Sequence, residues 1–241
     1  MNNIRVTAEG DSSLFVEFEQ KISPEVNRRI AAVVKLIRQQ QIEGIVDMIP
    51  TYCSLLISYN PLVISYREIH ERISSIARMD TKVESVRKRI FEIPVLYGGE
   101  GGPDLPAIAS HAGLSEEEVI AIHSGRDYLI YMLGFLPGFT YLGGLDERIH
   151  TPRLPNPRVR IPAGSVGIGG SQTGIYPVDS PGGWQLMGIT PVKTYDPGRE
   201  KPILVEAGDY IRFRPVSAPE YEEIRGAVSE GSYQLTVREG D

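Results

Sequence analysis

Cysteine, tryptophan and long apolar runs are scarce in this chain of 241 residues. The single cysteine, Cys53, excludes an internal disulfide, and such low usage is typical of proteins in reducing compartments. No apolar run approaches the roughly 18 residues of a membrane-spanning helix, and the first residues lack the apolar core of a signal peptide. We therefore expect a cytoplasmic protein that makes no contact with a membrane.

A strong charge of either sign is also lacking. The 25 Lys and Arg residues and the 31 Asp and Glu residues leave a net charge of −6. A mildly acidic chain is poorly suited to neutralising phosphates, so we expect no nucleic-acid partner. Apolar residues make up 41% of the chain, which is enough to offset the entropy of ordering and excludes a mostly disordered protein.

Most catalytic motifs are missing as well. Residues 164–171 approach a P-loop, but Gly170 occupies the position of the phosphate-binding lysine. Gln172 stands where a dinucleotide-binding fingerprint requires its last glycine. There is no nucleophile elbow, and the four histidines lack metal-ligand spacing, so we predict no metal site. His111 and His123 fall on predicted short helices, where a structural role is more common than a functional one.

Glycine is distributed unevenly and divides the chain. Residues 1–90 contain only Gly10 and Gly44, whereas residues 131–190 contain twelve of the 25 glycines. This shift in composition predicts a boundary near residue 88. We therefore expect one domain over residues 1–88 and a second over residues 89–241, with the charged stretch 81–89 as linker or helix end.

The first domain is predicted to be a small antiparallel α/β unit. Ser23 and Pro24 have the chemistry of a helix start, and apolar residues then recur at helical spacing. The order strand–strand–helix–strand–strand–helix favours a sheet covered on one face. The predicted strands are residues 4–8, 14–18, 45–49 and 54–59. One helix is predicted to begin at Ser23 and the other to cover residues 65–78.

The second domain is predicted to be a closed or nearly closed β-barrel, because its strands are short and punctuated by Gly and Pro. Two short helices interrupt them, one capped by Asp104 and one by the capping box of Ser115 and Glu118. The tail from Glu220 has weak periodicity and is expected to be loosely attached. The predicted strands are residues 91–96, 128–133, 158–162, 166–168, 173–176, 184–189, 203–206 and 210–213.

The region 131–190 carries the unusual chemistry, because every cation in it is arginine. A guanidinium matches carboxylate or phosphate oxygens, and glycines expose backbone N–H groups. A pocket for a small anionic molecule is one interpretation. The other is structural, since small barrels need glycine at bulges and arginine stems cover their surfaces. Phe135, Phe139 and Tyr141 either line a pocket or plug the barrel end, and Trp184 is assigned to the core.

Several motifs in this order resemble the KipI/PxpB family, also called allophanate hydrolase subunit 1. The similarity extends over residues 4–215. The segments that carry it are GDSS at 10–13, IPVLYGG at 93–99, GFLPGF at 134–139, HTPR at 150–153, IPAGSVGIGG at 161–170, QTGIYP at 172–177 and SPGGWQL at 180–186.

This resemblance implies an α+β fold, with a small N-terminal ferredoxin-like domain followed by a cyclophilin-like β-barrel. It implies the B subunit of an ATP-dependent 5-oxoprolinase, working with PxpA-like and PxpC/KipA-like subunits. ATP with Mg²⁺ would be a cosubstrate, and no tightly bound cofactor is expected. Two other family roles stay open: inhibition of a sporulation sensor histidine kinase, and carboxyl transfer in a urea carboxylase or allophanate system. No Met-Lys pair for biotin attachment occurs in the chain.

The expected reaction needs cations and oriented N–H groups around developing negative charge more than it needs a nucleophile. Arg153 and Arg160 are predicted to contact carboxylate or phosphate and to converge on one pocket, with His150 as a candidate acid or base. The residues predicted to bind substrate or ATP are Ser165, Gly167, Gly169, Gly170, Gln172, Thr173, Tyr176 and Ser180.

Overall fold

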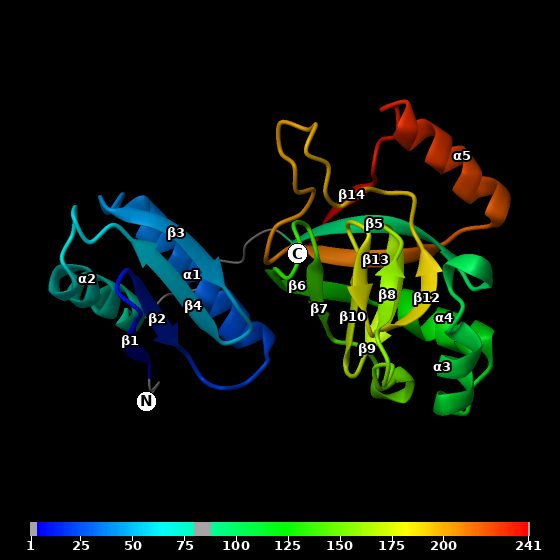
Figure 1. Ribbon diagram of the computed structural model, residues 1–241, viewed down its shortest axis with the longest axis horizontal. Helices are drawn as coiled ribbons and strands as arrows, with labels where there is room; N and C mark the ends of the chain where they lie inside the picture. Colours follow the sequence, from blue (N-terminus) through cyan, green and yellow to red (C-terminus); the bar gives the residue numbers. More distant parts are fainter. Residues whose placement is uncertain (1–3, 80–87, 241) are drawn as a thin grey trace. The chain divides into compact units, whose positions relative to one another are not determined.

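The computed structural model describes residues 4–79 and 88–240 and divides the chain into two compact units, Met1–Val86 and Arg87–Asp241 (Figure 1). Each unit has its own apolar core. Most of the predicted linker 81–89 lies outside the described residues. Among the residues described, no helix has the length and apolar character needed to cross a bilayer.

The N-terminal unit is a four-stranded antiparallel sheet in the order β1-β2-β4-β3. Moving the last strand of the β-α-β-β-α-β motif to the front of the chain reproduces this element order, so the unit is a permuted form of the ferredoxin-like arrangement. Its elements are β1 (Arg5–Glu9), β2 (Ser13–Glu17), α1 (Pro24–Gln39), β3 (Ile45–Pro50), β4 (Ser54–Tyr59) and α2 (Tyr66–Arg78).

Both helices of this unit begin where the sequence predicts. The Ser23 side chain accepts a hydrogen bond from the Val26 N–H, and Ser65 accepts one from Glu68. Leu14 and Leu55 are fully buried on the sheet face that receives the apolar sides of the helices, including Ile30 of α1. Alternation along the strands and helical period along α1 thus create one shared core.

The C-terminal unit contains a closed barrel of seven strands within the described residues. The order is β12-β9-β10-β7-β6-β13-β5, and pairing of β5 with β12 closes the ring. β13 and β5 are parallel, and β14 pairs with residues 88–91 of β5, which the short contact with β12 at Leu96 and Tyr97 leaves open. The barrel strands are β5 (Lys88–Tyr97), β6 (Asp127–Leu133), β7 (Thr140–Gly143), β9 (Ser165–Gly169), β10 (Gln172–Ile175), β12 (Gln185–Ile189) and β13 (Tyr210–Pro215), with β14 at Val237–Gly240.

Two further strands and several helices decorate the barrel (Figure 1). β8 (Arg158–Ile161) and β11 (Ser180–Gly182) form a separate two-stranded ladder. The capping box of Ser115 and Glu118 forms as predicted at the start of α4. The helices are α3 (Leu105–Ala112), α4 (Glu116–Ser124) and α5 (Ala218–Ser229), with short 3-10 turns at η1 (Gly99–Gly101) and η2 (Glu147–Ile149).

Two predictions for the barrel unit are wrong. Residues 203–206 form no strand, because only an isolated bridge between Tyr195 and Ile203 pairs there. The tail from Glu220 is not loose, since it contains most of α5 and the strand β14, which pairs with β5. Its periodicity is weak because Ile224 is the buried residue of α5 and β14 lies at a sheet edge.

Candidate functional site

A small cavity opens in the barrel unit beside the loop 134–139. Its volume is about 110 Å³. Residues from four separate stretches of the chain meet at its walls, which are mostly aromatic and contain a single charged group. The lining residues are Phe135, Phe139, Tyr141, Arg153, Tyr176, Gly182, Gly183 and Trp184.

The aromatic walls hold one another edge to face. Phe139 lies at the centre, with ring centroids 5.0 Å from Tyr141, 5.3 Å from Tyr176 and 5.5 Å from Trp184. Their interplanar angles of 62°, 80° and 75° match the preferred geometry of aromatic pairs. Phe139, Tyr176 and Trp184 are each no more than 4% exposed. Dense packing therefore fixes these walls, whereas Phe135 is 63% exposed at the rim.

Glycines allow the aromatic rings to lie directly on the backbone. A Cβ atom on Gly169 would sit 2.3 Å from Nε1 of Trp184, and one on Gly182 would sit 2.5 Å from the Tyr176 oxygen. Any side chain at either position would displace a wall of the cavity. The absence of a side chain at Gly169 thus makes room for the indole. Trp184 is buried, as predicted, and it also lines the cavity.

An ion pair holds the segment that carries Trp184. Arg158 donates to Asp104 at 2.7 Å and to the Trp184 carbonyl at 3.4 Å. The second oxygen of the Asp104 carboxylate accepts from the Leu186 N–H at 2.6 Å. Asp104 therefore links the start of α3 to both β8 and β12, and Arg158 acts as a support for the cavity wall.

Arg153 is the charged group of the cavity. Its guanidinium carbon lies 5.8 Å from the centre of the Trp184 ring, within the range of a cation–π contact. Among the arginines described in the barrel unit, Arg153 alone lacks a carboxylate partner. The paired ones are Arg89, Arg126, Arg148, Arg158, Arg160, Arg199, Arg212, Arg214, Arg225 and Arg238.

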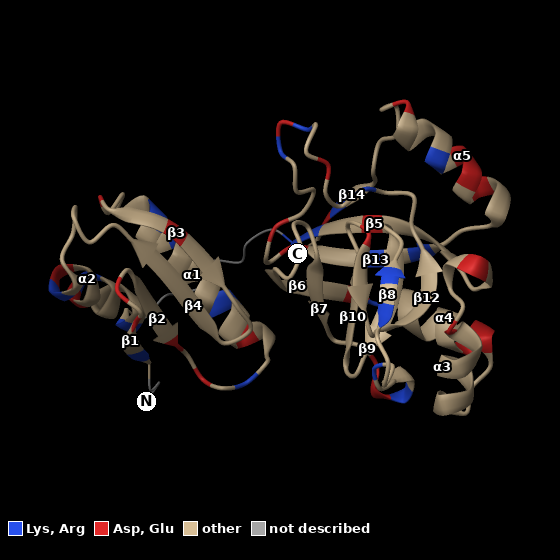
Figure 2. Cartoon of the chain, in the orientation of Figure 1, with Lys and Arg blue, Asp and Glu red and all other residues tan. Residues whose placement is uncertain are grey.

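The predicted convergence of Arg153 and Arg160 is not found. Figure 2 colours the Lys and Arg positions of β8 blue, and Arg160 is a residue of this strand. Its side chain is 76% exposed and donates to Asp179 at 2.6 and 2.8 Å. The other oxygen of Asp179 accepts from the Ala163 N–H, and this backbone bond, followed by Arg160, lowers the pKa of the carboxyl. Arg160 is neutralised at the surface because the β8–β11 ladder places Asp179 beside it.

His150 lies outside the cavity lining. Its Nε2 is 3.2 Å from the carbonyl oxygen of Leu145. A carbonyl only accepts, so Nε2 carries the proton, and this contact ties the ring to the backbone. The role of His150 as acid or base stays a prediction.

Most of the other predicted binding residues lie within the barrel wall. Ser165 is buried and donates to the Pro162 carbonyl at 2.7 Å. A Cβ atom on Gly167 would lie only 2.8 Å from the Gln185 carbonyl oxygen, so a side chain there has no room. Gly170 adopts a φ of +67° in the β9–β10 turn. Gln172 pairs with Gly169 across that hairpin, and Ser180 pairs with Ile161 in the β8–β11 ladder. Of the residues predicted to be catalytic or to bind substrate or ATP, only Arg153 and Tyr176 line the cavity. Phe135, Phe139 and Tyr141, for which the sequence left two interpretations open, line it as well.

Thr173 belongs to a buried hydrogen-bonded chain in the barrel interior. Its hydroxyl donates to the Gly167 carbonyl at 3.0 Å, so the 2.8 Å contact with His123 requires Nε2–H as donor. Nδ1 of His123 then accepts from the Tyr97 hydroxyl at 2.7 Å. Burial lowers the pKa of His123 to about 3. His123 is therefore a neutral core group, as the sequence favoured.

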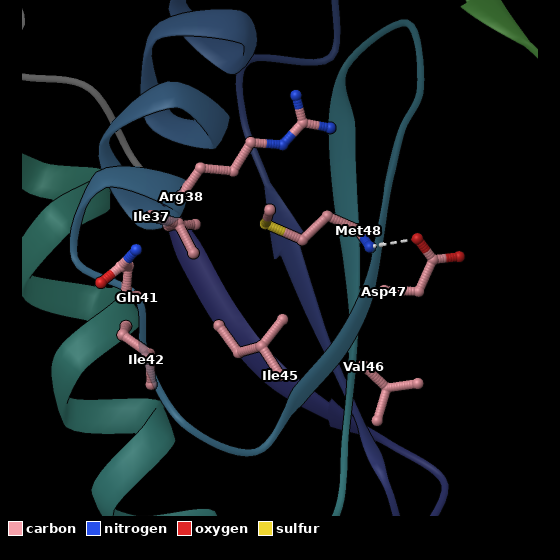
Figure 3. Close-up of a pocket in the computed structure, with 8 residues that line it drawn as sticks. All are labelled: Ile37, Arg38, Gln41, Ile42, Ile45, Val46, Asp47 and Met48. Atoms are coloured by element: carbon pink, nitrogen blue, oxygen red, sulfur yellow. Dashed lines mark hydrogen bonds between the residues drawn. The ribbon is translucent and has the colours of Figure 1, made fainter. Parts of the chain in front are cut away.

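A larger hollow of about 300 Å³ lies in the N-terminal unit, between the end of α1 and β3 (Figure 3). Ile37, Ile45 and Met48 give it an apolar surface. The Asp47 carboxylate points away from Ile45 and accepts from the Met48 N–H at 2.7 Å. Polar groups do not converge there. Within residues 4–79 and 88–240, no cluster of His, Cys, Asp or Glu could hold a metal ion.

Comparison with known proteins defines the class to which this barrel and its cavity belong. Residues 4–205 match the family model of the carboxyltransferase domain, subdomain C and D, and the chain belongs to this family. The B subunit of 5-oxoprolinase from Bacillus subtilis (strain 168) is 42% identical over 226 residues, which cover 88% of this chain and 92% of that protein. The corresponding 5-oxoprolinase B subunit from Escherichia coli O157:H7 is 42% identical over 216 residues, 89% of this chain and 97% of that protein.

Solved structures share this fold. The crystal structure of TTHA0988 superposes with a TM-score of 0.75 at 39% identity, and the match covers 86% of this chain and 40% of that longer chain. The Kluyveromyces lactis urea carboxylase superposes with a TM-score of 0.80 at 22% identity, covering 98% of this chain and 24% of that one. This second similarity is evidence for the fold alone.

Proposed function

We propose that this chain is the B subunit of an ATP-dependent 5-oxoprolinase, which opens 5-oxo-L-proline to L-glutamate. One observation carries the proposal: 42% identity over nearly the full length of two B subunits of that enzyme. Its partners would be PxpA-like and PxpC/KipA-like subunits. The urea amidolyase of Saccharomyces cerevisiae is only 24% identical, and this chain matches 14% of its length, so a carboxyltransferase role has weaker support.

In this reaction the γ-phosphoryl group of ATP passes to the lactam oxygen, which ends the amide resonance. Water then adds to the activated carbon, the C–N bond breaks, and glutamate, ADP and phosphate leave. The walls of the cavity offer aromatic faces and one guanidinium but no carboxylate, imidazole or thiol. Such a site binds and orients an anionic substrate. The cavity is too small for a nucleotide, so ATP would bind elsewhere in the complex.

Reconstitution tests the proposal. The chain is mixed with its PxpA-like and PxpC-like partners, and ADP and glutamate release are followed with and without 5-oxo-L-proline. We expect both products only when all three proteins, ATP and Mg²⁺ are present. An equal rate without this chain would contradict the proposal. Avidin blotting of co-purified proteins detects a biotin carrier, which would instead favour carboxyl transfer.

A further inference from the structure

We propose that the cavity between Arg153 and Trp184 is the subsite for the lactam substrate, with the ring among the aromatic side chains and the carboxylate on Arg153. This inference rests on the proposed function and assigns the substrate-binding side of that function to named residues. Three properties of the cavity support it: its size, its charge and its rim.

The size fits a single small ring. A volume of about 110 Å³ corresponds to roughly four water molecules at about 30 Å³ each, which is the scale of one small ring and well below that of a nucleotide. The walls bury apolar ring atoms on Phe139 and Trp184, which are themselves fixed by packing. Tyr176 also lines the cavity, and its phenol adds a polar hydroxyl to a wall that is otherwise aromatic.

The charge selects an anion. Aromatic boxes of this kind are also suited to organic cations, but the guanidinium of Arg153 already lies over the Trp184 ring and would repel a second cation. Because Arg153 has no carboxylate partner among the described residues of the barrel unit, its positive charge remains available to a ligand. A guanidinium binds a carboxylate through two parallel hydrogen bonds, which would fix the substrate's orientation.

The rim carries backbone strain. Phe135 has a φ of +63°, which non-glycine residues rarely adopt. Its ring nevertheless makes an edge contact with Phe139 at 5.6 Å while remaining largely exposed. Such outliers often accompany binding sites, and a ligand in the cavity would cover part of this exposed ring.

Trp184 supplies a direct readout, because it is the only tryptophan in the chain. Titration of the full-length protein with 5-oxo-L-proline should change its fluorescence saturably. Arg153→Gln should weaken binding about 10- to 100-fold, as expected for a lost charge-assisted hydrogen bond. The matched control Arg160→Gln, which removes an exposed arginine paired with Asp179, should bind normally. 2-Pyrrolidinone, which lacks the carboxylate, should bind at least about tenfold more weakly, and choline should not bind.

Kinetics of the reconstituted complex separate this inference from the proposed function. We expect Arg153→Gln to raise KM for 5-oxo-L-proline about tenfold or more with a smaller effect on kcat, and Arg153→Lys to recover part of the loss. An active wild-type complex in which Arg153→Gln leaves KM within about twofold would overturn the subsite while the function stands. An inactive complex in which this chain still binds 5-oxo-L-proline through Arg153 would reject the function and retain the site. Unchanged thermal unfolding of each variant excludes misfolding.

Discussion

Replacing His123 by glutamine should make the barrel less sensitive to acid. The ring is fully buried, stacks on Phe213 at 4.5 Å, and forms hydrogen bonds with the Tyr97 and Thr173 hydroxyls. Its pKa falls from 6.5 to about 3 on burial. Between these values the unfolded chain binds a proton at this site and the folded chain does not. The free energy of unfolding therefore decreases as the pH drops below about 6.5, and the contribution linked to His123 continues to fall until about pH 3.

The size of this effect follows from the two pKa values. Each pH unit in that window costs about 1.4 kcal/mol, so moving from about pH 7 to about pH 4.5 should remove roughly 2 to 3 kcal/mol of stability through His123 alone. Tyr97 and Tyr128, which contact the ring, do not contribute because burial raises the pKa of both phenols. Surface carboxylates also titrate, but they do so equally in both proteins.

Urea unfolding followed by Trp184 fluorescence measures the barrel, since the chain's only tryptophan lies in that unit. At about pH 7 the glutamine variant should be less stable by about 1 to 3 kcal/mol because its hydrogen bonds and stacking are weaker. Between about pH 7 and about pH 4.5, the free energy of unfolding of the variant relative to the unsubstituted protein should rise by roughly 2 to 3 kcal/mol, so that the deficit becomes small or changes sign. A deficit that is the same at both pH values would refute the assignment of His123 as the buried neutral group.

Three further substitutions test the supports of the cavity and its unit. Gly169→Ala places a methyl group 2.3 Å from the indole nitrogen; it should cost about 1 to 3 kcal/mol in urea unfolding and shift Trp184 emission, and unchanged emission would contradict the contact. Gly226→Ala, in open space on α5, should raise stability by about 0.5 to 1 kcal/mol; a loss of helicity by circular dichroism would argue against α5. Asp104→Ala strands the Leu186 N–H and Arg158; it should cost about 1 to 3 kcal/mol, whereas no change in the urea midpoint would dismiss this link.

The fold was predictable where local signals and packing agree. In the N-terminal unit, the buried residues of α1 recur at helical spacing and Ser23 caps the helix, so sequence and structure coincide. At the C-terminal end of the chain they diverge. α5 buries little beyond Ile224. β14 forms because it pairs with residues 88–91 of β5, and a short stretch of sequence does not reveal this distant partner.

The region of the cavity was predictable from the sequence, but the residues that line it were not. Gly169 and Gly170 are adjacent and look alike, yet one holds the Trp184 ring and the other turns a hairpin at positive φ. Arg153 and Arg160 are equally plausible in sequence. They differ because Asp179, distant in the chain, neutralises only Arg160. Glycine and arginine signalled a special region, while long-range pairing decided which members face the cavity.

The composition of the cavity also limits which steps of the proposed reaction the residues of this chain could carry out. Rigid rings and one guanidinium without a carboxylate partner suit a small acid, but the lining offers no carboxylate, imidazole or thiol that could take a proton from water, and burial raises the pKa of the Tyr176 phenol. His123 does not supply such a group, since it is buried and neutral, and the role of His150, which lies outside the lining, stays a prediction. On the proposed function, we expect the reacting lactam bond to face outward past Phe135, where a partner protein would supply the base and the phosphoryl donor. Substitution of Phe135 should then weaken turnover in the complex more than binding by the isolated chain, and equal effects on both would place the chemistry within the cavity itself.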